Sequence, residues 1–449
     1  MLSRALILSL LLFLFVSCAP REVSEVKVEG LLNAANPTSE HEIDVEEEGE
    51  VAIALTAHGV GTSWDRRGAE AAVISLHVDD AYKADVVLFR GEKPHEYQAL
   101  LGHLTKGKHR LTFRYEPKKS AHGAQGARID EFKLHVYPPE DPLYDVIHHA
   151  PIIYGRKDAN HTDVPLLMYH EKWTEDGHTV IQYTFIFSNE DGGTPPEGLM
   201  ARWGRLTDIE WCYRVELDEE GEVVRGKYQG DGHETVKFRG EKEGRHPLLR
   251  VCTKNNMFSD RGKSPFRFAL VPEMSLPKGH SREEMMDLNP WTYEVMALEW
   301  AREGHKDPGG PDTVAVSDPR NYVYVEFNSC SASGRSDCTG QVVLIKLKGD
   351  PKWYPSDHDN PSLSVKSCGW RRVTVEVPSG RKEIEAVRFA IRPQRKGVPI
   401  CVLRDIGKVF MLDGNFMPTP SVLEWHGEKL LDADPDTPEP DQVTFKVGK

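Results

Sequence analysis

The stretch Trp203-Gly-Arg-Leu-Thr-Asp-Ile-Glu-Trp-Cys-Tyr-Arg-Val-Glu-Leu217 alternates between apolar and polar side chains from Thr207 onward. The apolar set is Ile209, Trp211, Tyr213, Val215 and Leu217, and the polar set is Asp208, Glu210, Cys212, Arg214 and Glu216. Successive side chains of a β-strand point to opposite faces, so this period of two predicts a half-buried strand.

Asp208 and Glu210 are neighbours on one face of that strand, about 6.5–7 Å apart at Cα. Two like charges this close repel unless a cation, a proton or an arginine lies between them. One interpretation is a metal site or an acid/base pair. The other is an ordinary solvated strand face on which Arg205 and Arg214 partly neutralise the carboxylates.

Short β-like runs bounded by turn residues recur on both sides of this strand. Clear examples are Val51–Thr56, Ala72–Val78, Lys108–Tyr115, Thr179–Phe187, Tyr322–Phe327 and Arg372–Val377. Helical spacing is confined to the segment between Ser281 and Gly304. The pattern predicts a mainly β chain of tandem antiparallel β-sandwich domains, jelly-roll-like, with a short helical insertion.

Composition shifts and turn clusters, above all Pro138-Pro-Glu-Asp-Pro142, suggest the domain boundaries. We expect a signal peptide at 1–18, a tether at 19–42, an N-terminal sandwich at 43–138, a central sandwich at 143–275, a helical linker at 276–310, a C-terminal β-rich region at 311–430 and a mobile tail at 431–449. The C-terminal region either completes the central sandwich or forms a third one.

The N-terminus has the features of a targeting segment. Arg4 precedes the apolar run Ala5–Val16, which is too short for a membrane span and ends in Phe15-Val-Ser-Cys18. This ending resembles a bacterial lipobox. The resemblance implies lipidation of Cys18 and a place in the cell envelope, at the outer membrane if the host has one, facing the periplasm or the cell surface. The alternative is a plain secretory signal.

Charge and cysteines restrict the partners further. The net charge is −14 without a basic stripe, which makes nucleic acid an unsuitable partner. Six cysteines remain after Cys18, namely Cys212, Cys252, Cys330, Cys338, Cys368 and Cys401. In an exported protein this even number predicts three disulfides. Sequence cannot choose among the fifteen pairings, although local spacing favours Cys330–Cys338, with Cys212–Cys252 and Cys368–Cys401 within their own regions.

Two loops carry candidate ligand-binding residues. Trp64 is either an exposed sugar platform or a hydrophobic loop anchor, and the nearby run Leu104–Leu111 resembles a turn and strand of jelly-roll carbohydrate-binding modules. Asn255 and Asn256 offer oxygen ligands or sugar hydrogen bonds, or they belong to a long surface turn.

A wider resemblance covers residues 148–260. An Ala150-Pro-Ile entry, a Gln182-Tyr strand, the Asp208-x-Glu210 strand and a downstream histidine occur in that order. This order resembles the vacuolar protein sorting-associated protein 62 family and, more distantly, the necrosis- and ethylene-inducing-like toxins. In those toxins the Asp and Glu of a Gly-His-Arg-His-Asp-Trp-Glu heptad help hold a divalent cation used to bind sugar headgroups.

The resemblance implies a metal role for Asp208 and Glu210, although the heptad's histidines are absent from Gly204-Arg-Leu-Thr-Asp-Ile-Glu210. His233 or Asp191 would then complete the site. An oxygen-rich set with one histidine suits Ca²⁺, Mg²⁺ or Mn²⁺ better than Zn²⁺.

Three functions remain open at this point. One is a lipid-anchored surface protein that binds glycans or other cell-surface ligands, aided by a cation. The second is a glycan-active enzyme, a glycoside hydrolase or lyase, using Asp208, Glu210 and His233 as acid and base. The third is a structural envelope lipoprotein.

Overall fold

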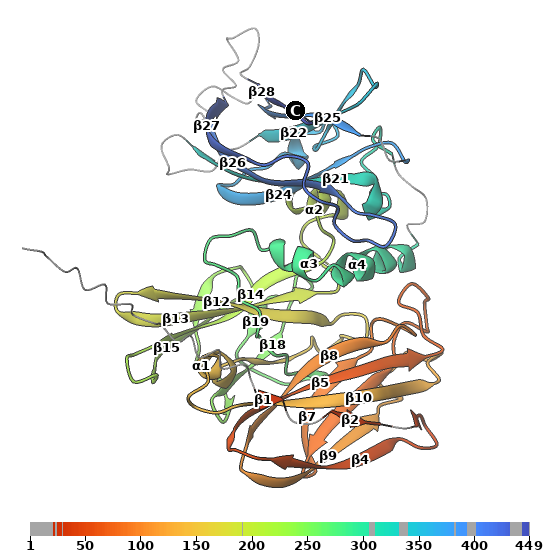
Figure 1. The fold of residues 1–449 in the computed structure, drawn as a ribbon, viewed down its shortest axis with the longest axis vertical. Coiled ribbons are helices and arrows are strands. Elements are labelled where there is room, and N and C mark those ends of the chain that lie inside the picture. Colours follow the sequence, from red (N-terminus) through yellow and green to blue (C-terminus); the bar gives the residue numbers. More distant parts are fainter. Residues whose placement is uncertain are drawn as a thin grey trace, which may run out of the picture.

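The computed structural model describes residues 21–22, 25–28, 30–190, 192–304, 310–331, 340–380, 383–392, 401–431 and 442–448. These residues form three β-sandwiches that follow one another along the longest axis, with a few short helices (Figure 1). The predicted mainly β fold of tandem sandwiches with a short helical insertion is therefore confirmed.

The N-terminal sandwich consists of two sheets that enclose apolar side chains such as Leu55, Leu76 and Phe113. One sheet contains β8 (His95–Leu104), β5 (Gly49–Val60) and β10 (Gly126–Tyr137), with β1 (Arg21–Glu22), β2 (Val26–Lys27) and β3 (Leu31–Leu32) along the far edge of β10. The other contains β4 (Thr38–Val45), β9 (Gly107–Tyr115), β6 (Val73–Val78) and β7 (Ala81–Val87). Much of the expected tether 19–42 is thus part of the sheets.

The central sandwich contains the strand predicted from Thr207 to Leu217. Its larger sheet has the order β12 (Pro165–Glu175), β13 (His178–Phe187), β14 (Asp208–Leu217), β15 (Val223–Gln229) and β16 (Thr235–Lys237). The second sheet contains β17 (Lys242–Glu243), β18 (His246–Val251), β11 (Ile152–Tyr154) and β20 (Arg267–Phe268), with β19 (Phe258–Ser259) beside β18. Strand β11 pairs with β18 in parallel. Helix α1 (Tyr144–His148) precedes β11, and α2 (Pro196–Trp203) connects β13 with β14.

A β-bulge in β14 changes which side chains share a face. Tyr213 pairs with Tyr183, but the next pair is Trp211 with Thr184, so Cys212 is an extra residue. Paired residues of neighbouring strands lie on the same face. Trp211 therefore lies opposite to the core residue Tyr213, and Cys212 is buried. The predicted alternation, with Trp211 on the apolar face and Cys212 on the polar face, is wrong at this point.

The same register places Asp208 and Glu210 beside Phe187 and Phe185. Both phenylalanines pack against Phe258 of β19, at ring-centroid distances of 6.2 and 6.3 Å. The two carboxyl groups do share a face, as predicted. That face points into the sandwich, so the alternative of an ordinary solvated strand face is wrong.

Two helices lie between the central and C-terminal sandwiches, α3 (Glu284–Leu288) and α4 (Trp291–Arg302) (Figure 1). Within the described ranges, no helix has the length and apolar character needed to cross a membrane. The core of the N-terminal sandwich continues into the central sandwich and reaches α4 through Val295 and Met296.

The C-terminal region forms a third sandwich with a separate core that includes Val325, Ile345 and Val387. This finding answers the question that the sequence left open. Its sheets contain β24 (Gly369–Glu376), β21 (Tyr322–Ser331), β26 (Cys401–Met411) and β27 (Trp425–Leu431), and β23 (Trp353–Pro355), β22 (Gln341–Leu347), β25 (Ile384–Ile391) and β28 (Val443–Lys446). Two short 3-10 helices, at Pro319–Asn321 and Pro361–Leu363, flank these strands. Within the expected mobile tail, β28 pairs with β25.

The disulfides differ from the pairing that local spacing favoured. Cys330 is bonded to Cys368, which excludes both Cys330–Cys338 and Cys368–Cys401. Cys401 is also disulfide-bonded, and Cys338 lies outside the described residues.

Cys212 and Cys252 are free thiols, so the prediction of a bond between them is wrong. Cys212 lies on β14 and Cys252 follows β18 of the facing sheet. A disulfide across facing sheets forms only where the two side chains point at each other, and sequence spacing does not show this.

Candidate functional site

Five of the predicted ligand residues converge at one end of the central sandwich. Asp208 and Glu210 begin β14, Asn255 and Asn256 come from the loop after β18, and His233 lies in the turn between β15 and β16. We call these residues, together with Glu190 from the loop after β13, the Asp208 cluster. The convergence was not evident from the sequence, because three separate connections supply the side chains.

Hydrogen bonds hold the cluster together from its base to its rim. At the base, Asn256 Nδ2 donates to Asp208 Oδ2 and to the carbonyl of Asn189, both at 3.0 Å. At the rim, the two ring nitrogens of His233 lie 3.0 Å from Gln229 Nε2 and 3.3 Å from Asn255 Nδ2. His233 is exposed and Asp208 is 1 % exposed, so the cluster extends from the surface to a buried carboxyl group.

The base of the cluster contains two buried side-chain amide oxygens that accept no hydrogen bond from the described residues. Asn256 has a left-handed backbone, at φ 55°, a conformation that asparagine tolerates better than most residues. Its amide is buried beside Asp208, and its Oδ1 has no hydrogen-bond partner among the described residues. Within the same part of the chain, the buried Oδ1 of Asn189 also has none. Buried acceptors are nearly always satisfied in native proteins, so these two oxygens indicate a missing partner.

The carboxyl groups of the cluster are incompletely neutralised. Arg205 lies 3.8 Å from Asp208 but closer to Glu283, at 3.1 Å. Burial, followed by the charge of Glu210, raises the pKa of Asp208 well above its ordinary range. Burial also raises the pKa of Glu190. The cluster therefore favours a proton or a bound cation.

The two arginines proposed as neutralising partners have different positions. Arg205 does approach Asp208. Arg214 lies on the opposite face, where it donates to Gln182 at 3.0 Å and packs over the ring of Trp211 at 4.9 Å. Its predicted role is therefore wrong. Arg282, which the sequence did not suggest, lies 3.9 Å from Glu210.

The loop after β13 supplies a carboxyl group that sequence reasoning missed. We predicted Asp191, which lies outside the described residues. The neighbouring Glu190 interacts electrostatically with Asp208, Glu210 and His233. Both acidic residues follow the strong strand pattern of β13, so the signal identified the loop but not the residue. In the part of the chain that the structure describes, no three His, Cys, Asp or Glu side chains are grouped closely enough to hold a metal ion.

Trp64 is an anchor and not a platform. Its side chain is 1 % exposed and meets the ring of Phe89 edge-on at 6.3 Å. The guanidinium group of Arg302, at the end of α4, lies 5.8 Å from the ring centre. The prediction of an exposed sugar platform is therefore wrong, because the helix that follows the central sandwich covers the indole.

Glu299 of α4 makes the stability of this region sensitive to pH. It is buried, and its Oε1 accepts a hydrogen bond from Asn189 Nδ2 at 3.2 Å. Burial raises its pKa from 4.5 to about 8. Between these values the folded protein holds a proton that the unfolded chain has released. The free energy of unfolding should therefore fall as pH rises through this range, by up to about 1.4 kcal/mol per pH unit.

We expect Glu299→Gln to flatten this dependence, since the amide cannot lose a proton. Urea unfolding of both proteins at about pH 5 and about pH 8 would measure the difference. Glu140→Gln, which changes an exposed carboxyl group, should leave the slope of the wild type unchanged. An equal slope in wild type and Glu299→Gln would contradict the prediction.

Comparison with known proteins gives structural neighbours but no family. No family model matches the chain, and no curated protein matches it. The CBM36-1 domain of a multidomain xylanase from the hindgut metagenome of Trinervitermes trinervoides is 15 % identical over 26 % of this chain and 99 % of that domain, with a TM-score of 0.20.

Two further neighbours have similar scores. A carbohydrate-binding module CBM36 in complex with calcium and xylotriose is 11 % identical over 26 % of this chain and 92 % of its own, with a TM-score of 0.20. NLPPya in complex with mannosamine is 11 % identical over 34 % of this chain and 81 % of its own, with a TM-score of 0.24. Structural neighbours thus include carbohydrate-binding modules and NLPPya, at scores too low to decide the function.

Proposed function

We propose that this protein binds hydroxyl-rich ligands, glycans of a cell surface, at the Asp208 cluster with the help of a divalent cation. The observation that carries the proposal is the convergence around a buried carboxyl group. Glu190 and Glu210 add negative charge to Asp208, and the amide oxygens of Asn189 and Asn256 lie buried without partners from the residues that the structure describes. A cation would offset the repulsion and satisfy these oxygens.

The donor atoms fit a hard cation. Carboxylate and amide oxygens are the ligands that Ca²⁺ and Mg²⁺ prefer. Asp208 would supply a carboxylate ligand, and Asn189 and Asn256 would supply neutral oxygens, while Glu210 and Glu190 would add negative charge from outside the ligand shell, since no three carboxyl groups of the described residues lie close enough together to hold one ion. When bound, the cation would supply a positive charge that attracts sugar hydroxyl oxygens.

The rim of the cluster is suited to contact a ligand. His233 is exposed, Asn255 and Glu190 are partly exposed, and Asp208 is buried beneath them. An imidazole and an amide can each donate to and accept from hydroxyl groups. We infer that these rim residues touch the glycan, whereas Asp208 holds the base of the site in place.

We expect Ca²⁺ to raise the melting temperature of the wild type and a chelator to lower it, because the cation removes repulsion from the folded state. Asp208→Asn combined with Glu210→Gln keeps the shapes but removes the charges, and the effect of Ca²⁺ should disappear. Differential scanning calorimetry with and without Ca²⁺ would measure this. Glu219→Gln with Glu220→Gln is the matched control, since it removes two exposed charges at the other end of β14.

The rival explanation is that a proton, Arg205 and Arg282 neutralise the carboxyl groups. In that case a chelator would leave the melting temperature of the wild type unchanged, and the cation part of the proposal would be wrong. Glycan-array binding with and without chelator, compared between wild type and His233→Ala with Asn255→Ala, tests the ligand part. Equal binding by wild type and variant would exclude the rim as the contact surface.

An enzymatic function is the second candidate, and one observation favours it. The raised pKa of Asp208 is typical of a general acid in glycoside hydrolysis. The carboxyl group is nevertheless buried and bonded to Asn256, so a substrate could not reach it without rearrangement. Release of new reducing ends from glycans by the wild type, lost in Asp208→Asn, would favour the enzyme over the binding protein.

The proposal includes export and anchoring through Cys18. The sequence run Ala5–Val16 before Ser17-Cys18 supports both. The disulfide between Cys330 and Cys368 supports export alone, because such bonds persist in oxidising compartments. Changing Cys18 to Ala should release the exported protein from membranes or block its processing. Continued partition of the exported variant with membranes would contradict lipidation.

A further inference from the structure

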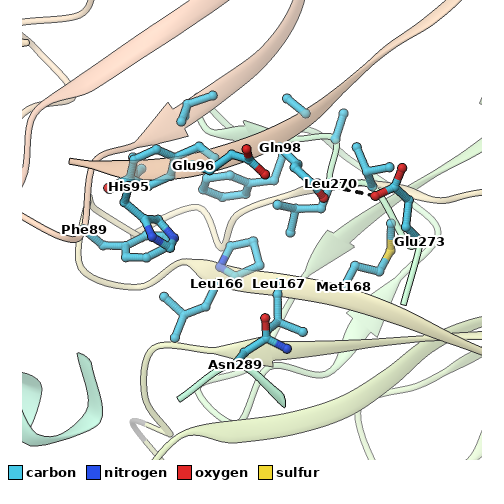
Figure 2. Close-up of a pocket in the computed structure, with 18 of the residues that line it drawn as sticks. Phe89, His95, Glu96, Gln98, Leu166, Leu167, Met168, Leu270, Glu273 and Asn289 are labelled. Carbon is cyan, nitrogen blue, oxygen red and sulfur yellow. Dashed lines mark hydrogen bonds between the residues drawn. The ribbon is translucent and has the colours of Figure 1, made fainter. Parts of the chain in front are cut away.

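A cavity of about 310 Å³ lies where the N-terminal sandwich meets the central sandwich (Figure 2). Strands β7 and β8 and the loop between them form one side, and β12, β20, the segment after β20 and the start of α4 form the other. The two sides are fastened to each other, because Leu100 N donates to Ala269 O at 2.7 Å and Arg267 N donates to Asp85 at 3.0 Å. The cavity is therefore a built feature of the junction.

One part of the lining is apolar and aromatic. Phe89 stacks on Trp291 at 5.4 Å, and His95 meets Trp291 and Tyr97 edge-on, both at 4.9 Å. Leu166 lies across the cavity from His95 in Figure 2. Burial lowers the pKa of His95 to about 4, so its ring is neutral at neutral pH.

Hydrogen-bonding groups, mainly acceptors, line the cavity as well. Gln98 donates to Glu273 at 3.4 Å, the bond drawn in Figure 2, and Tyr137 OH donates to the other oxygen of Glu273. Asn289 Nδ2 donates to Met285 O at 2.9 Å. Glu96 adds a further carboxylate. None of the described residues that line the cavity is lysine or arginine, so the lining does not suit an anion.

We propose that this junction cavity binds one small neutral ring that carries hydroxyl groups, of the size of a single pyranose. The volume is at the lower end for ligand pockets, which limits the occupant to a small molecule. Apolar side chains together with acceptors on several sides, Glu96, Glu273 and Asn289 (Figure 2), suit a ring with one apolar face and hydroxyl donors around its edge. The site shares no residue with the Asp208 cluster and does not depend on a cation there.

An ammonium ligand is the main competitor and fits less well. Recognition of such cations uses open aromatic faces. Here Phe89 and Trp291 cover one another, and His95 and Tyr97 meet edge to face.

Calorimetric titration of the full chain with glucose, galactose, mannose and xylose, each singly, tests the proposal. We expect saturable binding of at least one of them, weakened about tenfold in Gln98→Ala by loss of one hydrogen-bonding side chain. Leu270→Trp, which fills the cavity, should abolish binding. Leu288→Trp is the matched control, because Leu288 is 62 % exposed and lies outside the cavity.

The melting temperature of each variant shows whether it folds. If Leu270→Trp does not fold, the comparison of wild type with Gln98→Ala tests whether the cavity binds the sugar. Absence of saturable binding to all four sugars, or equal binding by wild type and Gln98→Ala, would overturn the proposal. Binding of choline in place of the sugars would also overturn it. Asp208→Asn with Glu210→Gln separates the two sites: sugar binding that this variant loses belongs to the Asp208 cluster and would overturn the junction proposal, whereas binding that it retains and Gln98→Ala weakens belongs to the junction.

Discussion

Replacing Arg372 with Leu is expected to lower the free energy of unfolding by about 3–5 kcal/mol. Arg372, on β24, is 0 % exposed. Its guanidinium group donates to both carboxylate oxygens of Asp287 at 2.7 Å and to Glu326 at 2.6 Å. It also donates to Tyr293 OH at 2.8 Å and to the carbonyl of Glu283 at 3.1 Å. Leucine would leave the buried carboxylates without this partner.

Urea unfolding of wild type and Arg372→Leu would measure the loss. Arg245→Leu is the control, since its ion pair with Glu222 is exposed and worth about 0–1 kcal/mol. Arg372→Leu combined with Asp287→Leu and Glu326→Leu should recover much of the stability, because an apolar replacement of the whole group leaves no buried charge. Equal losses in Arg372→Leu and Arg245→Leu would contradict the interpretation.

Trp64→Ala is expected to cost about 3–5 kcal/mol of unfolding free energy. The indole is buried between Phe89 and Arg302, so its removal leaves a cavity between the N-terminal sandwich and α4. Trp64→Phe, which retains part of the volume, should cost less. Chemical unfolding of the three proteins measures the order of stability.

The same variants separate the two interpretations of Trp64. If Trp64→Ala retained full stability but lost glycan binding, the residue would be a ligand platform after all. If stability falls and binding persists in the folded fraction, the anchor role is established. Trp353, a half-buried tryptophan at the start of β23, offers a control for the general effect of tryptophan removal.

The sequence was informative where local pattern determines local structure. The alternation from Tyr213 to Leu217 predicted a strand and its buried face correctly. The bulge at Cys212 was not predictable, because it depends on the register with β13 and changes no residue type in β14. One extra residue exchanges the faces of everything before it, which is why Trp211 and Cys212 were assigned to the wrong sides.

The candidate site was likewise predictable only in part from the sequence. Asp208, Glu210, His233, Asn255 and Asn256 were chosen for their chemistry, and the structure brings them together. Glu190 was missed because adjacent carboxyl groups in a loop cannot be ranked without the loop's path. The burial of Trp64 and the ion network of Arg372 depend on α3 and α4 packing against distant strands, which no local pattern records.

The core that runs from the N-terminal sandwich through the central sandwich to α4 has a consequence for how the chain melts. Residues that share a core lose their packing together, so we expect both sandwiches to unfold in a single cooperative step. The C-terminal sandwich has an additional core of its own, but Tyr324 and Phe410 belong to the shared core and Arg372 binds Asp287, so we expect its unfolding to be coupled to that step. A fragment that ended at the proline-rich turn near residue 140 would uncover the surface that Leu100 and Phe89 share with their neighbours, and such a fragment should aggregate. The unit of folding thus includes at least these two sandwiches, although the proline-rich turn at 138–142 separates them in the sequence.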